Sequence, residues 1–242
     1  MKLKNSLRKC KKNKLVKHLN IILAGPTGAG KSTLINKILN LTGEKAIKTA
    51  IGAPCTMGDP KYYESETIPL LRLADSRGIE KTDYRMKELN ESIEKFIKGQ
   101  LDSENPDLFI HCIWYCITGT RLEPIERDTL RELSKIYQSN SIPIIIVYTR
   151  ALSKLNTEEM KKFIHDNFDF AHDFIPVLAL KDIIRDEFPP LNPFGIDKLK
   201  EISVLIAKEA VKSSCYEFSV QKTKKEVKEI INKKRKFKYC IK

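Results

Sequence analysis

The segment that most constrains the fold of this chain is Gly25–Ser32, which reads GPTGAGKS. It matches the pattern GxxxxGK[ST] and lies between a short apolar run, Asn20–Ala24, and an amphipathic stretch, Ser32–Leu41, so the local order is strand, loop and helix. Glycines let backbone N–H groups turn inward around phosphate oxygens, and the following helix presents the positive end of its dipole to them. Lys31 can then reach the β and γ phosphates of a nucleotide, and Ser32 can bind Mg²⁺. The segment therefore predicts a nucleotide-phosphate loop.

The rest of the chain alternates apolar runs with amphipathic stretches. The predicted strands after the loop are Tyr62–Glu66, Ile68–Ala74, Leu108–Ile117, Ile142–Tyr148 and Phe174–Ala179, with the first two as an antiparallel pair. The predicted helices are Tyr84–Leu101, Pro124–Tyr137, Thr157–Phe168 and Gly195–Ser213. The third of these helices would have Glu158 and Glu159 in its first turn, where the helix dipole favours acids. Strands that alternate with helices predict a three-layer α/β fold, with a mostly parallel sheet and helices on both faces.

The net charge of the chain is concentrated at its two ends. The 242 residues, 41% of them hydrophobic, suffice for one domain with a full core, and the net charge is +13. Residues 1–19 carry eight Lys or Arg and no acid, whereas residues 221–242 carry ten against two acids, so each end is +8 and the middle is slightly acidic. The predicted domains are a basic extension at 1–18, a globular domain at 19–213 and a basic helical tail at 214–242.

Three interpretations of the basic ends stay open. They can be solvated tails, they can bind nucleic acid through its phosphates, or they can bind an anionic membrane surface, which the apolar residues within 227–239 favour. No run of eighteen apolar residues predicts a transmembrane helix, and the six cysteines form no CxxC pair. We expect a reducing, cytoplasmic location; among the two binding roles of the ends, peripheral attachment to a membrane is favoured over nucleic acid.

Two further motifs can sense a γ-phosphate. The tetrapeptide DSRG begins at Asp75, directly after a predicted strand, so that Asp75 can hold Mg²⁺ through water and Gly78 can donate its N–H to the phosphate. In the loop between this motif and the phosphate loop, Thr56 of the segment GAPCT can complete the Mg²⁺ shell, and Thr49 competes for that role. Mg²⁺ is therefore the predicted cofactor.

In order along the chain, the segments GPTGAGKSTLIN, GAPCT, LADSRGIE, HCIWYCI and IIIVYTR resemble the G domain of the Era-like, septin-like and dynamin-like P-loop GTPases. The resemblance covers roughly residues 18–212. It implies that Lys31, Thr56 and Gly78 carry catalysis, and that Ser32, Thr56 and Asp75 hold Mg²⁺. The nucleotide-binding residues that it implies are Gly25, Thr27, Gly28, Ala29, Gly30, Lys31, Ser32, Thr33, Thr149, Arg150 and Ala179.

The chain departs from the family pattern at two positions. Ile79 follows the glycine of DxxG, where Ras-type enzymes use a glutamine to orient the attacking water. Leu152 ends the segment TRAL, where the [NT]KxD motif of the family has the aspartate that reads guanine. Arg150 of that segment can still stack on the base, and Ala179 can offer it a backbone N–H. The first departure resembles a branch whose members often need a partner or a dimer for fast hydrolysis.

We therefore expect a P-loop GTPase that binds GTP with Mg²⁺ and hydrolyses it slowly to GDP and phosphate. It would act as a nucleotide-dependent switch or assembly protein, with a homodimer or an activating partner. Two alternatives stay open. One is a scaffold that binds nucleotide without hydrolysing it, which Ile79 and Leu152 favour, and the other is an ATP-using P-loop enzyme. His111, inside a predicted strand, is expected to be a packed residue rather than a catalyst.

Overall fold

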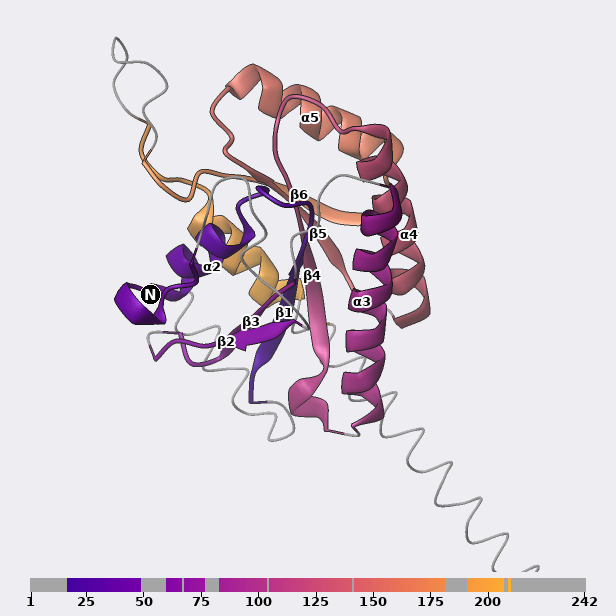
Figure 1. Cartoon of the computed structure of the whole chain (residues 1–242). Coiled ribbons are helices and arrows are strands. Elements are labelled where there is room, and N and C mark those ends of the chain that lie inside the picture. The colour runs from indigo at the N-terminus through magenta and orange to yellow at the C-terminus, as the bar shows by residue number, and fades with distance from the viewer. Residues whose placement is uncertain are drawn as a thin grey trace, which may run out of the picture.

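The computed structural model describes residues 17–48, 60–66, 68–76, 83–103, 105–140, 142–181, 191–206 and 209. These residues contain a six-stranded sheet with the strand order β2-β3-β1-β4-β5-β6 (Figure 1). The strands are β1 (Leu19–Ala24), β2 (Lys61–Tyr63), β3 (Leu71–Asp75), β4 (Ile110–Ile117), β5 (Ile144–Thr149) and β6 (Ala171–Val177). β2 is antiparallel to β3, and all the other neighbours are parallel. The predicted α/β fold and its antiparallel pair are confirmed.

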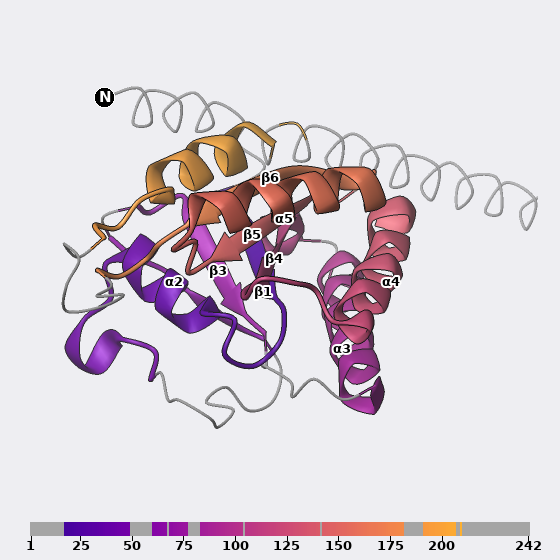
Figure 2. The ribbon, with the colours of Figure 1, turned by 90° about the horizontal axis from the view of Figure 1, so that it is seen from above.

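Helices cover both faces of the sheet, as the view from above in Figure 2 shows. The helical elements are α2 (Lys31–Leu39), α3 (Asp83–Asp102), α4 (Pro124–Asn140), α5 (Lys154–Asn167) and the short 3-10 turns η1 (Gly43–Lys45) and η2 (Pro106–Leu108). A last helix is formed by residues 196–206. One apolar cluster joins α3, α4 and α5 to the sheet, and a second joins α2 and the last helix to the opposite face. The three predicted layers are thus present.

The central strands β1, β4 and β5 are buried along their whole length. Near-continuous apolar runs are typical of parallel strands that are covered on both faces. Because side chains alternate along a strand, Ile22 packs in the first cluster whereas Ile21 and Leu23 pack in the second. Cys112 and Cys116 of β4 are free thiols, fully buried as small core residues.

The only tryptophan of the chain fixes the last helix to the sheet. Trp114 of β4 is fully buried, and its Nε1 donates to the Ser203 hydroxyl at 2.9 Å. That hydroxyl donates in turn to the Leu199 carbonyl at 2.6 Å, so both buried polar groups are paired. The helix starts beside β6, where a Cβ on Gly195 would collide with the Pro176 carbonyl oxygen. Only glycine therefore allows the chain to pass so close to the strand.

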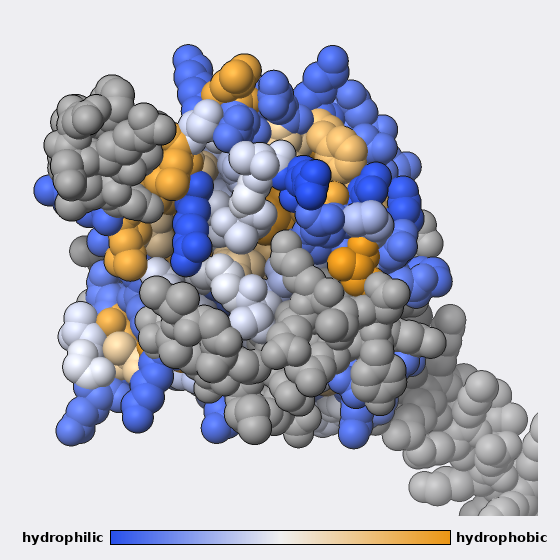
Figure 3. All heavy atoms as spheres, turned by 45° about the horizontal axis from the view of Figure 1, so that its top comes forward, coloured by the Kyte–Doolittle hydropathy of each residue, from blue (hydrophilic) through white to orange (hydrophobic). Residues whose placement is uncertain are grey.

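The surface at the carboxyl ends of the strands is mixed in polarity (Figure 3). Large apolar side chains that are exposed in the described residues are Leu155, Leu180, Phe194 and Leu205. The first three come from segments that follow β5 and β6. Among the described residues in this view, the apolar areas are separated by polar ones (Figure 3).

The start of α5 differs from the prediction. The helix begins at Lys154, earlier than expected, because the Ser153 side chain accepts a hydrogen bond from the Asn156 N–H at 3.3 Å and caps the N-terminus. The prediction that Glu158 and Glu159 lie in the first turn is therefore wrong. A serine cap outweighs the weaker preference of acids for a helix start.

The bounds of several strands also differ. The predicted Tyr62–Glu66 is shorter and is β2, Lys61–Tyr63. β3 begins at Leu71, after a turn at 68–70. β6 begins and ends earlier than the predicted Phe174–Ala179; its start, which includes His172 and Asp173, lies at the edge of the sheet and has no apolar run that would predict a strand. No helix among the described residues is apolar enough over a sufficient length to cross a membrane. The basic segments 1–16 and 210–242 lie outside the described residues.

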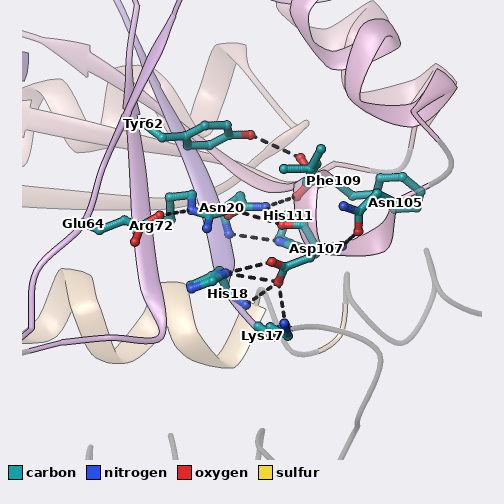
Figure 4. A network of polar contacts seen from close by, with 11 residues as sticks. Lys17, His18, Asn20, Tyr62, Glu64, Arg72, Asn105, Asp107, Phe109 and His111 are labelled. Carbon is teal, nitrogen blue, oxygen red and sulfur yellow. Dashed lines mark hydrogen bonds and ion pairs between the residues drawn. The ribbon is translucent and has the colours of Figure 1, made fainter.

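A polar network ties the start of β1 to η2 and β4, at the end of the sheet opposite the phosphate loop (Figure 4). The Asp107 carboxylate accepts from the backbone N–H groups of Lys17 and His18, at 2.7 and 2.9 Å, and lies 3.0 Å from His18 Nδ1. The Asn20 side chain donates to the Asp107 carbonyl, and its backbone N–H donates to His111 Nδ1 at 3.0 Å. Burial acts to raise the pKa of Asp107, but the hydrogen bonds from His18 and Lys17 outweigh it and hold the pKa below its usual value.

His111 in this network is a source of acid sensitivity. Its ring is buried, and burial lowers its pKa from 6.5 to about 4 against the opposing effect of Asp107. Because the folded pKa lies below the unfolded one, the stability that the neutral ring contributes is complete above pH 6.5 and is lost as the pH falls toward about 4. The variant His111→Asn keeps an acceptor for the Asn20 N–H. When the pH falls from about 7 to about 4.5, we expect its free energy of unfolding to decrease by about 2 kcal/mol less than that of the wild type.

Urea unfolding at the two pH values measures this difference. His172→Asn is the matched control, because His172 is exposed on β6, and it should follow the wild type. Equal losses in the wild type and in His111→Asn would show that the ring does not resist protonation in the fold.

Candidate functional site

The loop between β1 and α2 leaves the sheet against the end of β4. Gly25 has a φ of 130°, and a Cβ on it would collide with the carbonyl oxygen of Cys116. Gly30 has a φ of 77° and is the N-cap of α2. Both conformations favour glycine, which has no Cβ. The loop thus curves over the carboxyl ends of the parallel strands, where open α/β sheets bind their ligands.

The first turn of α2 offers backbone donors to an anion. Because Gly30 has no side chain, no side-chain cap hydrogen bond is made to this turn. The N–H groups of Lys31, Ser32 and Thr33 therefore stand at the positive end of the helix dipole without a capping acceptor. The Thr27 hydroxyl is buried within the loop and has no hydrogen-bond partner among the described residues. Phosphate oxygens suit such a set of donors.

Lys31 lies inside the loop rather than in solvent. It is 6% exposed, and its Nζ donates to the carbonyls of Gly25 and Pro26 at 2.8 and 2.9 Å. Burial lowers the pKa of Lys31, while Cys116 and Asp75 act in the opposite direction. Burying a cation costs free energy unless an anion compensates it. A phosphate in the loop would supply that compensation.

Ser32 and Asp75 meet beside the loop. The Ser32 hydroxyl donates to Asp75 Oδ2 at 2.8 Å, and Asp75 is fully buried at the end of β3. Hydroxyl and carboxylate oxygens fit Mg²⁺, which binds through few protein oxygens together with substrate phosphates and water. No group of three or more His, Cys, Asp or Glu side chains that could hold a metal ion occurs in the part of the chain that the structure describes. A magnesium ion at Ser32 and Asp75 would therefore share its shell with a nucleotide.

Thr149 supports the phosphate loop. It ends β5 and is buried, and its hydroxyl lies 2.9 Å from the Ala29 carbonyl oxygen and 3.0 Å from that of Ile117. Through these contacts Thr149 positions the loop, and the nucleotide-binding role that the resemblance implies for it stays a prediction. This bridge and the contact of Cys116 with Gly25 could not be deduced from spacing, because distant strands meet only in the folded sheet. In the sequence, the only indication of this role was that a residue with a hydroxyl group, Thr149, directly follows a predicted strand.

The two predicted base contacts stand at neighbouring strand ends. Arg150 is exposed and has a φ of 52°. The N–H of Ala151, the next residue, donates to the Val177 carbonyl at 3.3 Å, which joins this loop to the end of β6. Ala179 follows that strand end and is partly buried. The loops that follow β5 and β6 are therefore held together.

The predicted residues thus divide into two groups. The structure gathers one group at the carboxyl end of the sheet: Gly25, Thr27, Gly28, Ala29, Gly30, Lys31, Ser32, Thr33, Asp75, Thr149, Arg150 and Ala179. The other group lies outside the described residues: Thr49, Thr56, Gly78 and Ile79.

A family model described as a 50S ribosome-binding GTPase matches residues 20–150, more than half of the chain. The matched range includes the phosphate loop, Asp75 and Thr149. The chain belongs to this GTPase family. It is therefore a P-loop GTP-binding protein.

Interferon-gamma-inducible GTPase 10 of Mus musculus is 36% identical to this GTPase over 70 residues, which are 29% of this chain and 17% of that protein. The match thus spans less than a fifth of that relative's length.

Solved structures resemble this GTPase over most of its length. The septin GTPase domain from Chlamydomonas reinhardtii superposes with a TM-score of 0.57 and 16% identity, covering 86% of this chain and 99% of that one. Toc33 from Arabidopsis thaliana in complex with Mg²⁺ and GMPPNP gives a TM-score of 0.59 and 16% identity, covering 86% and 91%. At such identities the likeness shows the fold alone, that of a P-loop G domain.

Proposed function

We propose that this GTPase binds GTP together with Mg²⁺ and hydrolyses it slowly to GDP and phosphate, as a nucleotide-dependent switch or assembly protein. The observation that carries the proposal is the hydrogen bond of 2.8 Å between the Ser32 hydroxyl and Asp75. It puts two oxygens that suit Mg²⁺ beside the uncapped N–H groups of α2. A nucleoside triphosphate with its metal needs both sets of groups at one place.

Within this site the groups of the chain hold the phosphates. Lys31 Nζ exchanges the carbonyl oxygens of Gly25 and Pro26 for phosphate oxygens, which carry full charge and form stronger hydrogen bonds. The first-turn N–H groups of α2 donate to the same phosphates. Mg²⁺, when bound by Ser32 and Asp75, supplies further neutralisation of phosphate charge. Because these groups stay in place as charge shifts during phosphoryl transfer, they lower the barrier without a side-chain base.

A slow intrinsic rate is part of the proposal. Ile79 stands where Ras-type enzymes have the glutamine that orients water. Among proteins of similar structure, dimerization is important for the GTPase activity of the chloroplast translocon components atToc33 and psToc159. We extend this behaviour to the present chain, so that a homodimer or an activating partner would raise its rate of hydrolysis.

A single-turnover assay tests the proposal, with the full chain in excess over labelled GTP and with Mg²⁺ present. We expect phosphate release whose rate constant rises with protein concentration, because association activates hydrolysis. The Lys31→Ala protein reports any contaminating phosphatase. GTP that stays bound and intact at every protein concentration would instead favour the non-hydrolysing scaffold. Equal turnover of ATP would favour the ATP-using enzyme.

A further inference from the structure

Three buried polar side chains lie at the apolar cluster that joins α3 and α4 to the sheet. They are Tyr115 of β4, Thr129 of α4 and Asn90 of α3. Asn90 precedes Ile93 and Ile97 of the cluster by three and seven residues, so it lies on the same buried face of α3. Its Nδ2 donates to the Thr129 carbonyl at 3.2 Å, which joins the two helices at this point. A polar group at such a depth lowers stability unless it forms a hydrogen bond.

Two polar groups of this set are unpaired. The Tyr115 hydroxyl and Asn90 Oδ1 form no hydrogen bond with the described residues. Burial raises the pKa of Tyr115 and the Glu126 carboxylate raises it further, so the phenol keeps its proton and is a donor. The Thr129 side chain acts on that pKa in the opposite direction, so Tyr115 and Asn90 both approach the same residue of α4. A donor on β4 and an acceptor on α3 therefore lie close to each other without partners.

These two groups favour a second arrangement of α3. A buried donor or acceptor without a partner costs more free energy than a typical hydrogen bond contributes. The phenol O–H and the amide oxygen are complementary, so an arrangement that pairs them removes both costs at once. Packed helices of switching proteins shift by about 1–2 Å, a distance over which a hydrogen bond is formed or lost. A shift of α3 of this size is therefore sufficient to pair the two groups.

The chain itself connects α3 to the nucleotide site. α3 is the next helix or strand along the chain after β3, which ends at Asp75. The N–H of Ser76 donates to the Leu23 carbonyl at 3.2 Å and continues the pairing of β3 with β1. Because side chains alternate along a strand, Ser76 faces the same side as Ala74, which packs in the cluster. A change at Asp75 is thus adjacent to the face of the sheet that α3 covers.

In the described conformation the phosphate-binding groups bind one another. Lys31 Nζ donates to two carbonyls of the loop, and the Ser32 hydroxyl donates to Asp75. A nucleoside triphosphate with Mg²⁺ replaces these contacts, because it needs the same ammonium, hydroxyl and carboxylate groups. The arrangement of α3 with its two unpaired groups therefore occurs together with a site that is closed on itself.

We propose that Tyr115 and Asn90 form a latch that favours the triphosphate form of this GTPase. In the diphosphate form α3 keeps the described arrangement, with both groups unpaired. When the Asp75 end of β3 binds a γ-phosphate with its Mg²⁺, α3 shifts and Asn90 Oδ1 accepts the Tyr115 hydroxyl. This hydrogen bond adds to the affinity for the triphosphate and not to the affinity for the diphosphate. The inference rests on the nucleotide site of the proposed function and is independent of hydrolysis.

Tyr115→Phe in the full chain tests the latch, because it removes the hydroxyl and keeps the ring. Without nucleotide, we expect the melting temperature to rise by about 3 °C, since an unpaired buried polar group has been removed. In Mg²⁺, the affinity for GMPPNP should fall about fivefold, the value of one hydrogen bond, whereas the affinity for GDP should change by less than about twofold. Thermal unfolding and titration calorimetry measure these effects. A lower melting temperature, or equal losses for both nucleotides, would overturn the latch.

Tyr148→Phe is the matched control, because the Tyr148 hydroxyl, on the neighbouring strand, is paired with the Gly119 carbonyl at 2.9 Å. It should lower the melting temperature by about 3 °C and leave the ratio of the two affinities unchanged. In the background of Asn90→Leu, which removes the acceptor, Tyr115→Phe should no longer change that ratio. An effect that persists there would also overturn the latch. Because GMPPNP is not hydrolysed, a chain that never releases phosphate from GTP would refute the proposed hydrolysis and leave these expectations intact.

Discussion

Lys31→Ala is expected to weaken binding of GDP and GTP by at least about a hundredfold, the value of two charged hydrogen bonds to phosphate. The physical reason lies in the position of the ammonium group. Lys31 is buried within the phosphate loop, and its Nζ is bound to the carbonyls of Gly25 and Pro26, where incoming phosphate oxygens can replace them. The Lys31 ammonium group binds the phosphate loop and not the apolar core, so the melting temperature of Lys31→Ala should differ little from that of the wild type. Titration of a fluorescent nucleotide and thermal unfolding measure the two effects.

The matched control is Lys37→Ala, on the exposed side of the same helix. It removes the same charge without touching the loop, and it should bind nucleotide like the wild type. A folded Lys31→Ala protein with wild-type affinity would show that phosphates do not bind in this loop.

Asp75→Asn should lower the affinity for a triphosphate in Mg²⁺ far more than the affinity for a diphosphate. Asparagine keeps an oxygen that accepts the Ser32 hydroxyl, so the hydrogen bond of 2.8 Å can survive the change. It removes the negative charge that helps to hold the metal. We expect the gain in GMPPNP affinity on adding Mg²⁺ to shrink by about tenfold or more, and hydrolysis to fall by at least as much.

Dissociation constants of GMPPNP and GDP, measured with and without Mg²⁺, give the effect of the variant on each nucleotide and on the gain in affinity from the metal. The control is Asp102→Asn. Asp102 is exposed at the C-terminal end of α3 and is not one of the site residues, so this variant removes one negative charge without changing the site. If Asp75→Asn weakens both nucleotides equally, whether or not Mg²⁺ is present, the carboxylate acts on the loop itself and not through a metal.

Local signals in the sequence account for most of the fold. The phosphate loop was recognisable because its glycines, Lys31 and Ser32 lie next to one another between two elements of different period. Long apolar runs marked the central strands, because a strand that is covered on both faces has no polar side. Asp75 could be placed because it directly follows the predicted strand Ile68–Ala74, at its carboxyl end. Its contact with Ser32 then follows from the parallel pairing of β1 with β3.

The rest depends on contacts between residues that are distant in the chain. The polar start of β6 forms a strand only because β5 lies beside it and supplies hydrogen-bond partners. The helix α5 starts at its serine cap, although acidic residues that follow pointed to a later start. The role of Thr149 depends on the carbonyl of Ala29, 120 positions away along the chain. A pattern of residue spacing within one segment cannot predict a contact between residues so far apart in the chain.

Because of the pairing of Trp114 with Ser203, intrinsic tryptophan fluorescence can report on conformational change in this protein. Because the chain has a single tryptophan, all indole emission arises at the contact between β4 and the last helix. The same strand touches the phosphate loop at its end, through Cys116. A shift of either the last helix or the end of β4 during nucleotide exchange would change the surroundings of that indole. Stopped-flow fluorescence of the unlabelled protein would then follow the exchange in real time, without a dye or an engineered probe.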